Sequence, residues 1–181
     1  MDKADKKRPA AEDAMQVVIF HVGGEDYGIG IDAVSEVIRP LPITPLPRMP
    51  EFVEGVINLR STIIPVVDLR RRFGVKGVSF DPRKTRMMII KGAAARGLLG
   101  FVVDGVREVT TVSSRDVDVV PEAARGPGSE FISGMAKLGD RLLILLNTAA
   151  ILSKEERAAL MEADRESAQV DQGQGMTPDG Q

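Results

Sequence analysis

The side chain best suited to acid-base chemistry in this sequence is a single histidine. His21 is the only histidine among 181 residues, and there is no cysteine. One imidazole and no thiolate support neither a multi-histidine metal site nor a Ser-His-Asp triad, and they exclude disulfides and thiol nucleophiles. His21 alternates with apolar neighbours, which predicts an ordinary strand residue on the polar side of a sheet.

Two aspartates form the next candidate site. Asp68 and Asp104 each follow an apolar run, Val66-Val67 and Val102-Val103. A pair of carboxylates can perform general acid-base catalysis. Aspartate at the end of a strand more often caps a turn by accepting backbone N–H groups, and we predict that role here. A hydrolytic or small-ligand-binding barrel that uses both aspartates is the alternative.

Glycine-rich segments could bind a cofactor, but two of them lack the necessary neighbours. Residues 92–97 have the glycine spacing of a phosphate loop, yet Leu98 stands where that motif needs lysine. Gly28-Ile-Gly30 begins like a dinucleotide fingerprint without the third glycine or a following helix. We therefore predict no catalytic residues, no cofactor and no metal, and a protein that is not an enzyme.

Composition and charge limit the partners. Lys and Arg total 24 against 26 Asp and Glu, aromatic residues make up 4%, and there is no tryptophan. This balance argues against nucleic acid, which favours a basic face and stacking rings.

Residues 1–15 contain no apolar core of a secretory signal, and the run Leu142–Leu146 is far shorter than the ~20 residues that span a bilayer. We expect a soluble protein without membrane insertion. Arg70-Arg71-Arg72 is expected to be solvated surface or part of a protein interface.

Many short, β-rich segments separated by turns predict an all-β barrel or sandwich. Prolines 40, 42, 45, 47 and 50 predict an extended connection rather than a helix. The expected strands are 16–22, 27–31, 55–59, 63–69, 86–91, 98–103, 106–112 and 141–146.

The ends of the chain have a different composition. Ser153-Lys-Glu-Glu156 is a capping-box pattern that predicts a short C-terminal helix over 153–165. Residues 166–181 are rich in Gln, Gly and Asp, which predicts a flexible tail. Residues 1–15 are expected to form a flexible N-terminal segment, which leaves 16–152 for the folded domain.

The sequence also resembles itself. Residues 27–37 align without a gap with residues 99–109, and residues 55–59 and 63–68 align with 134–138 and 142–147. The same order in both halves predicts two related small barrels, in pseudo-repeats of about 16–73 and 86–152. Exchange of strands between the halves is left open by the alignment.

An ordered series of motifs resembles a known family. The motifs are Tyr27-Gly28-Ile29, Val34-Ser-Glu36, Gly55-Val-Ile-Asn-Leu-Arg60, Ile64-Pro-Val-Val-Asp-Leu-Arg70, Gly100-Phe-Val-Val-Asp-Gly-Val106, Gly139 to Asn147 and Ser153-Lys-Glu-Glu156. In this order they are similar to the CheW family of chemotaxis coupling proteins, over about residues 16–165. The resemblance implies two intertwined five-stranded SH3-like β-barrel subdomains with a short C-terminal α-helix.

The resemblance also implies a function without catalysis. CheW-like proteins are cytoplasmic adaptors that hold the histidine kinase CheA and methyl-accepting chemoreceptors in one membrane-associated array, so that receptors control the kinase. The expectation for this chain is the same role, or the alternative of a CheW-like adaptor in a parallel chemosensory pathway for motility or development.

Four positions match family residues that are important for coupling: Val34, Glu36, Gly55 and Arg60. An arginine fork can bind Glu36 or a carboxylate of a partner. Gly55 aligns with Gly134, so it can serve the scaffold alone, whereas Arg60 aligns with Gly139, which suggests that the barrel does not need arginine there. Ser61 stands where the family usually has glycine, and if this turn requires positive φ, serine bears a modest steric cost that glycine avoids.

Overall fold

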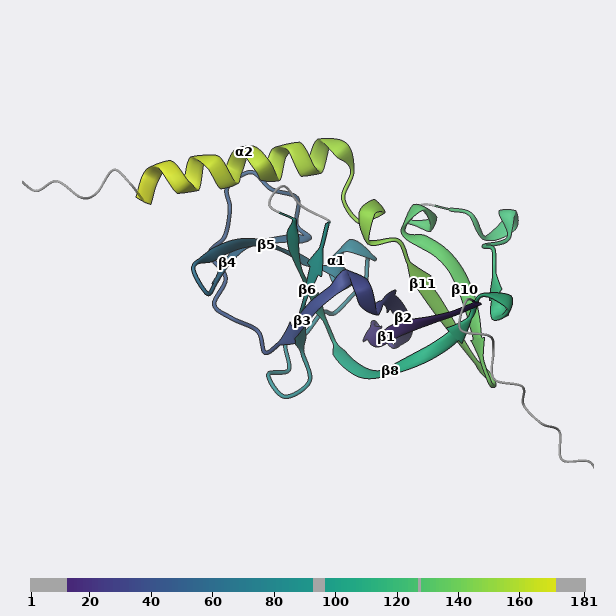
Figure 1. Ribbon diagram of the computed structural model, residues 1–181. Coiled ribbons are helices and arrows are strands. Elements are labelled where there is room, and N and C mark those ends of the chain that lie inside the picture. The colour runs from purple at the N-terminus through teal and green to yellow at the C-terminus, as the bar shows by residue number, and fades with distance from the viewer. Residues whose placement is uncertain (1–12, 93–96, 127, 172–181) are drawn as a thin grey trace, which may run out of the picture.

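The computed structural model describes residues 13–92, 97–126 and 128–171. Two β-sheets lie side by side, and a C-terminal helix crosses the five-stranded one (Figure 1). The six-stranded sheet has the order β8 (Gly105–Ser113), β1 (Ala14–Val22), β2 (Glu25–Gly30), β11 (Arg141–Leu146), β10 (Ile132–Leu138) and β9 (Val117–Asp118). The five-stranded sheet has the order β3 (Val34–Ile38), β6 (Arg86–Lys91), β7 (Leu98–Val103), β5 (Thr62–Asp68) and β4 (Val53–Leu59). The helices are α1 (Leu69–Arg72) and α2 (Lys154–Asp171).

The two sheets are topological copies of each other. If β1, β2, β3, β4 and β5 are matched with β6, β7, β8, β10 and β11, the order of one sheet becomes the order of the other, with β9 as an added edge. Each sheet contains one parallel pair at the matching place, β2 with β11 and β5 with β7. The strand patterns alone did not predict β3 and β10. In this scheme β3 is matched with β8, and β10 is matched with β4.

Each sheet is completed by a hairpin from the other half of the chain. The N-terminal hairpin β1–β2 lies between β8 and β11, and the later hairpin β6–β7 lies between β3 and β5. The exchange is reciprocal, so the two units are intertwined. The all-β, intertwined fold class is thus confirmed.

The exchanged strands β1 and β6 are buried on both faces. In β1, Val17 and Ile19 pack inside the six-stranded sheet, whereas Val18 and Phe20 pack into the core between the sheets. In β6, alternate residues divide in the same way between the interior of the five-stranded sheet and the shared core. Burial on both faces requires continuous apolar runs rather than alternation, which explains the sequences VVIF and MMII.

The proline-rich connection follows the edge of the five-stranded sheet. Thr44 forms two backbone hydrogen bonds of 2.9 Å with Val56 of β4. The six-stranded sheet has the matching contact, because β9 pairs Asp118 with Met135, the residue that aligns with Val56. The connection forms no helix, as expected, and is extended at Thr44, but residues 47–48 form a turn in which Arg48 has a φ of 58°. The bridge at Thr44 is the counterpart of strand β9.

Helix α2 begins at the predicted capping box. The Ser153 hydroxyl accepts a 3.1 Å hydrogen bond from the Glu156 backbone N–H, and the Glu156 carboxylate accepts one of 2.7 Å from the Ser153 N–H. The helix continues to Asp171, beyond the expected end at 165, because no glycine or proline interrupts it before Gly173. Part of the expected tail is therefore helical, while 172–181 lie outside the described residues. At the other end β1 begins at Ala14, and 1–12 also lie outside them.

Arg72 anchors this helix to the body. Its guanidinium carbon lies 4.2 Å from the ring centre of Phe52 and 4.7 Å from that of Phe131. It also donates to the Ile151 carbonyl (2.9 Å) and to the Glu156 carboxylate (3.2 and 3.3 Å). Stacking between two rings with paired hydrogen bonds suits the planar arginine fork.

The exchange of hairpins predicts that the halves of the chain cannot fold separately. If the backbone is cut after Gly77, residues 1–77 lack the β6–β7 hairpin and residues 78–181 lack β1–β2, so neither piece can close its sheet. We expect each fragment alone to be unfolded and an equimolar mixture to regain the native structure, measured by far-UV circular dichroism and NMR shift dispersion. Cooperative unfolding of either fragment by itself would contradict the exchange.

Candidate functional site

Two of the four predicted site residues meet across the open edges of the five-stranded sheet. Glu36 lies in the edge strand β3, and Arg60 lies in the turn after the opposite edge strand, β4. The guanidinium donates two hydrogen bonds to the carboxylate, Nη1 to Oε1 at 2.7 Å and Nη2 to Oε2 at 2.9 Å. The sheet must therefore curl until its edges approach each other, and this ion pair closes the seam between them.

The pair is asymmetric in its exposure. The Arg60 side chain is 74% exposed and that of Glu36 only 27%. Hydrogen bonds from Arg60, together with its charge, lower the pKa of Glu36 below its ordinary value, and the same contacts raise the pKa of Arg60. Two of the five guanidinium N–H groups are used, so the fork is held in place with donors still directed to solvent.

The turn that carries Arg60 has an uncommon backbone. Leu59 pairs with Thr62, which leaves Arg60 and Ser61 as a two-residue hairpin loop. Both have positive φ, 49° and 67°. Such loops match the twist of the strands but are disfavoured for residues with a Cβ atom. The turn therefore does require positive φ at Ser61, and serine occupies the left-handed region in which glycine would be unstrained.

Gly55 lies elsewhere and supports the edge strand. It is five residues before Arg60, ~17 Å along an extended strand. Its φ is +136°, and a Cβ atom at this position would lie 2.0 Å from the Thr44 carbonyl oxygen. The close passage of the proline-rich connection therefore requires glycine. Its counterpart Gly134 sits at the matching bulge, where a Cβ would lie 2.8 Å from Val117 Cγ1.

Val34 begins β3, two residues before Glu36. Its half-buried side chain packs against the core between the sheets. A register shift separates Val34 from Glu36 in the pairing with β6. The structure thus joins Glu36 with Arg60, places Val34 on the same strand and leaves Gly55 apart.

A second ion pair of the same kind was missed in the sequence. Glu108, the counterpart of Glu36, has its Oε1 atom 3.6 Å from Arg141 Nη2, and both side chains are about half exposed. The alignment set Arg60 against Gly139, so the arginine two residues later went unnoticed. The position that matches Arg60 is still Gly139, so the expectation that the barrel does not need arginine there is not contradicted. Arg141 is the first residue of β11, directly after the turn, and a search for basic residues beside the turn would have found it.

Asp68 and Asp104 bind one buried arginine. Arg70 donates to Asp68 from Nε (2.9 Å) and Nη2 (2.7 Å), and its Nη1 lies 3.3 Å from Asp104. Asp68 also accepts from the Arg70 backbone N–H at the start of α1, and Asp104 accepts from that of Gly23. The predicted role is confirmed for Asp68, which caps the start of α1, whereas Asp104 binds the backbone of the distant β1–β2 turn rather than of its own. These carboxylates are engaged by structural donors, which removes the basis for a catalytic pair.

The basic cluster 70–72 was misjudged as surface. Arg70 is 5% exposed, and hydrogen bonds from its guanidinium to Asp68 raise its pKa despite burial. Arg72 is enclosed by two rings, and only Arg71 is exposed, with Glu54 3.2 Å away. A carboxylate two residues before Arg70 was the available signal for burial, since a buried arginine needs a partner.

Within the described residues, no group of three His, Cys, Asp or Glu side chains could hold a metal ion. His21 has its Nδ1 atom 3.2 Å from Asp26 and 3.0 Å from Arg107 Nε, so it belongs to a surface network. No helix in the described part is long and apolar enough to cross a membrane.

Comparison with known proteins identifies close relatives. The family model described as CheW-like domain matches residues 16–156. Chemotaxis protein CheW of Klebsiella aerogenes is 37% identical over 143 residues, covering 79% of this chain and 84% of that protein. Chemotaxis protein CheW of Helicobacter pylori is 31% identical, covering 84% and 90%. The crystal structure of the scaffolding protein TtCheW from Thermoanaerobacter tengcongensis superposes with a TM-score of 0.71 at 31% identity, covering 78% of this chain and 94% of that one.

The geometry of Gly55 predicts a large effect of a single methyl group. We expect Gly55→Ala to lower the free energy of unfolding by about 2–3 kcal/mol, because positive φ and the Thr44 carbonyl both oppose a side chain. Gly30→Ala is the matched control: its Cβ would meet open space and its φ is −53°, so we expect a change within about 0.5 kcal/mol. Urea denaturation measures both. Equal effects would refute the crowding at Gly55.

The seam ion pair predicts the titration of Glu36. In the native protein its carboxylate should titrate below the ordinary value of about 4.3, and in Arg60→Ala it should return towards that value. Because folding lowers this pKa, any stabilisation from the pair is present above about pH 4.3 and is lost as the pH falls through the lowered pKa. NMR of the side-chain carboxyl carbon measures the shift.

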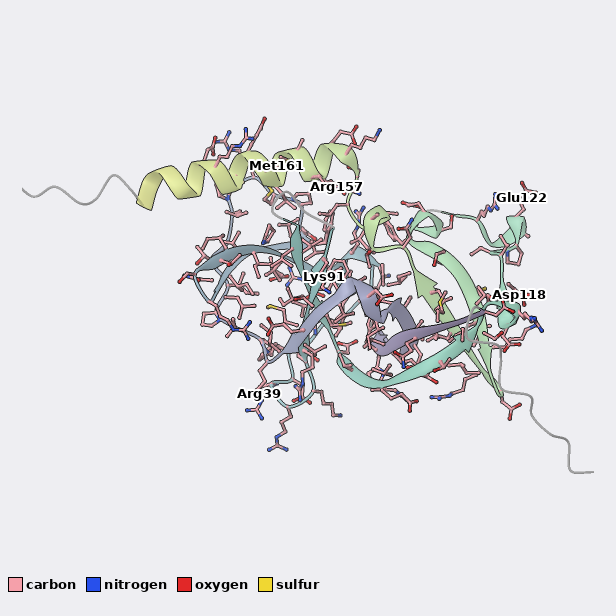
Figure 2. The ribbon with its side chains drawn as sticks, viewed as in Figure 1. Arg39, Lys91, Asp118, Glu122, Arg157 and Met161 are labelled. Atoms are coloured by element: carbon pink, nitrogen blue, oxygen red, sulfur yellow. The ribbon has the colours of Figure 1, made fainter. Side chains whose placement is uncertain are left out.

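Arg39→Ala is the control for that titration. Arg39 is exposed three residues from Glu36, at the lower edge of the molecule in Figure 2, and forms no ion pair with a described carboxylate. Its removal should leave the Glu36 titration in place. An equal change in both variants would mean that the general positive charge, not the fork, lowers the pKa.

Proposed function

This chain belongs to the CheW-like domain family, and from that membership we propose that it is an adaptor that couples methyl-accepting chemoreceptors to the histidine kinase CheA. Receptor state then controls kinase activity through contacts rather than through a reaction on the adaptor. Its place is the cytoplasmic side of a membrane-associated receptor array. The observation that carries the proposal is the similarity along four-fifths of the chain to proteins named for chemotaxis and scaffolding.

We propose further that the chain has no catalytic activity of its own. Among the described residues, the side chains best suited to chemistry are engaged in the fold. Asp68 and Asp104 bind Arg70, and His21 lies between Asp26 and Arg107. An adaptor needs stable, exposed contact groups instead.

The proposed contact surface is the seam of the five-stranded sheet. Arg60 is its central residue, because its exposed guanidinium is already oriented by Glu36 and retains free donors for a partner carboxylate. Val34 adds a partly buried apolar side chain on the same strand. Gly55 contributes indirectly, by letting the proline-rich connection lie against β4.

The alternative is an adaptor in a parallel chemosensory pathway for motility or development. One relative has a different name, Protein FrzA of Myxococcus xanthus, at 28% identity over 144 residues. The two proposals share a mechanism and differ in the kinase and receptor served. Copurification of this chain with its native partners separates them.

A charge exchange tests whether the seam pair acts as a contact or only as a brace. The double variant Glu36→Arg, Arg60→Glu keeps an ion pair across the seam but reverses what a partner meets. We expect it, and Arg60→Ala, to retain the melting temperature, because exposed ion pairs contribute little to stability. Both should lose receptor-dependent stimulation of CheA autophosphorylation in a reconstituted mixture.

The pair Lys137 and Asp118 provides the matched control. Its atoms lie 3.1 Å apart, both side chains are well exposed, and Asp118 is at the opposite end of the molecule from Arg39 (Figure 2). Exchange of these two charges should leave kinase stimulation unchanged. Full stimulation by the Glu36 and Arg60 exchange would rule out the seam as a contact, and no stimulation by the native chain would rule out coupling to that kinase.

A further inference from the structure

A cleft of about 540 Å³ opens where the β1–β2 hairpin meets the segment before β6 and the first residues of β8. Its lining contains four cationic side chains and one carboxylate, Arg83, Lys84, Arg86, Arg107 and Asp104, together with the imidazole of His21. It shares no residue with the Glu36 and Arg60 seam. The proposed coupling surface therefore does not account for it.

The charges of this cleft are unbalanced. Among the described residues, Arg83, Lys84 and Arg86 form no ion pair; Arg86 donates to the Thr85 carbonyl at 2.8 Å. The single carboxylate of the lining, Asp104, is already engaged by the Gly23 N–H at 2.8 Å and by Arg70. The cleft is thus strongly positive in a chain whose formal charge is −2.

This local excess of cations is not a property of the chain as a whole. Acidic residues outnumber basic ones in the sequence, and the enclosed arginines Arg70 and Arg72 each have carboxylate partners. Arg107, also in the lining, has Asp26 at 3.4 Å. Cations left near one another without counter-charges repel, and an incoming anion removes that repulsion. The arrangement is that of a site that binds an anionic ligand.

The chemistry of the lining selects the kind of anion. Three of the four cations are arginines, whose forks match carboxylates. No Phe, Tyr or Trp of the described chain lines the cleft, so bases have no stacking platform apart from the imidazole. The amide of Gly23, beside the cleft, is already taken by Asp104 and is not available to a phosphate.

We propose that this cleft is a docking site for an Asp- and Glu-rich segment of a partner protein, distinct from the seam surface. The segment's carboxylates would bind Arg83, Lys84, Arg86 and Arg107. His21 and Gly105 are neighbours in the lining, where a Cβ at Gly105 would lie 3.2 Å from the His21 ring.

The test uses the full chain and an octaglutamate peptide, with octaglutamine as the neutral peptide. Binding is followed by NMR amide shifts at low and high salt. We expect shifts centred on 21–26, 83–86 and 104–107, and an affinity that falls at least ~10-fold in the variant Arg83→Glu, Lys84→Glu, because the reversed charges repel the ligand. Both residues are exposed, and Arg83→Ser, Lys84→Ser provides a milder change if the first variant unfolds.

The control carries the same change in net charge away from the cleft. Arg125→Glu, Lys154→Glu alters two other exposed cations and should change the affinity less than ~2-fold, since distant exposed charges are screened. Equal weakening in both variants, or no binding of octaglutamate, would overturn the proposal. So would cleft-dependent binding of phosphatidylglycerol vesicles or inorganic phosphate without binding of the peptide. None of these measurements involves the kinase, so the outcome is independent of coupling.

Discussion

Strands β1 and β6 are buried on both faces, and the rest of the molecule depends on that burial. Each strand separates the interior of one curled sheet from the core shared by both. β1 comes from the first half of the chain and completes the sheet of the second half, and β6 does the reverse. Removing either would expose two cores at once. The two barrels are therefore one cooperative unit, although their strand orders are copies.

Much of this architecture could be read from the sequence. The apolar runs of β1 and β6, the capping box at Ser153 and the turn role of Asp68 follow from local chemistry. The alignment of the two halves anticipated a common strand order. It could not reveal the hairpin exchange, because a strand has the same pattern whether its neighbours come from its own repeat or from the other one.

The errors have a common physical origin in tertiary context. Arginine is usually a surface residue. The nearby carboxylate of Asp68 makes the burial of Arg70 possible, and two aromatic rings that are distant in sequence enclose Arg72. Arg141 was missed because the alignment compared positions, whereas a long side chain can reach the same carboxylate from two residues away. The site was easiest to predict where a backbone requirement, as at Gly55, coincides with a family motif.

The hairpin exchange also bears on how the protein is made. During synthesis, β1 and β2 leave the ribosome first, yet their neighbours in the sheet, β8 and β11, follow some eighty or more residues later. An apolar hairpin must wait without its final partners while the intervening residues are synthesised, a period in which exposed strands are prone to wrong pairing. The exchange of hairpins makes the finished domain cooperative. For the same reason, the chain is most exposed to wrong strand pairing before its last strand emerges.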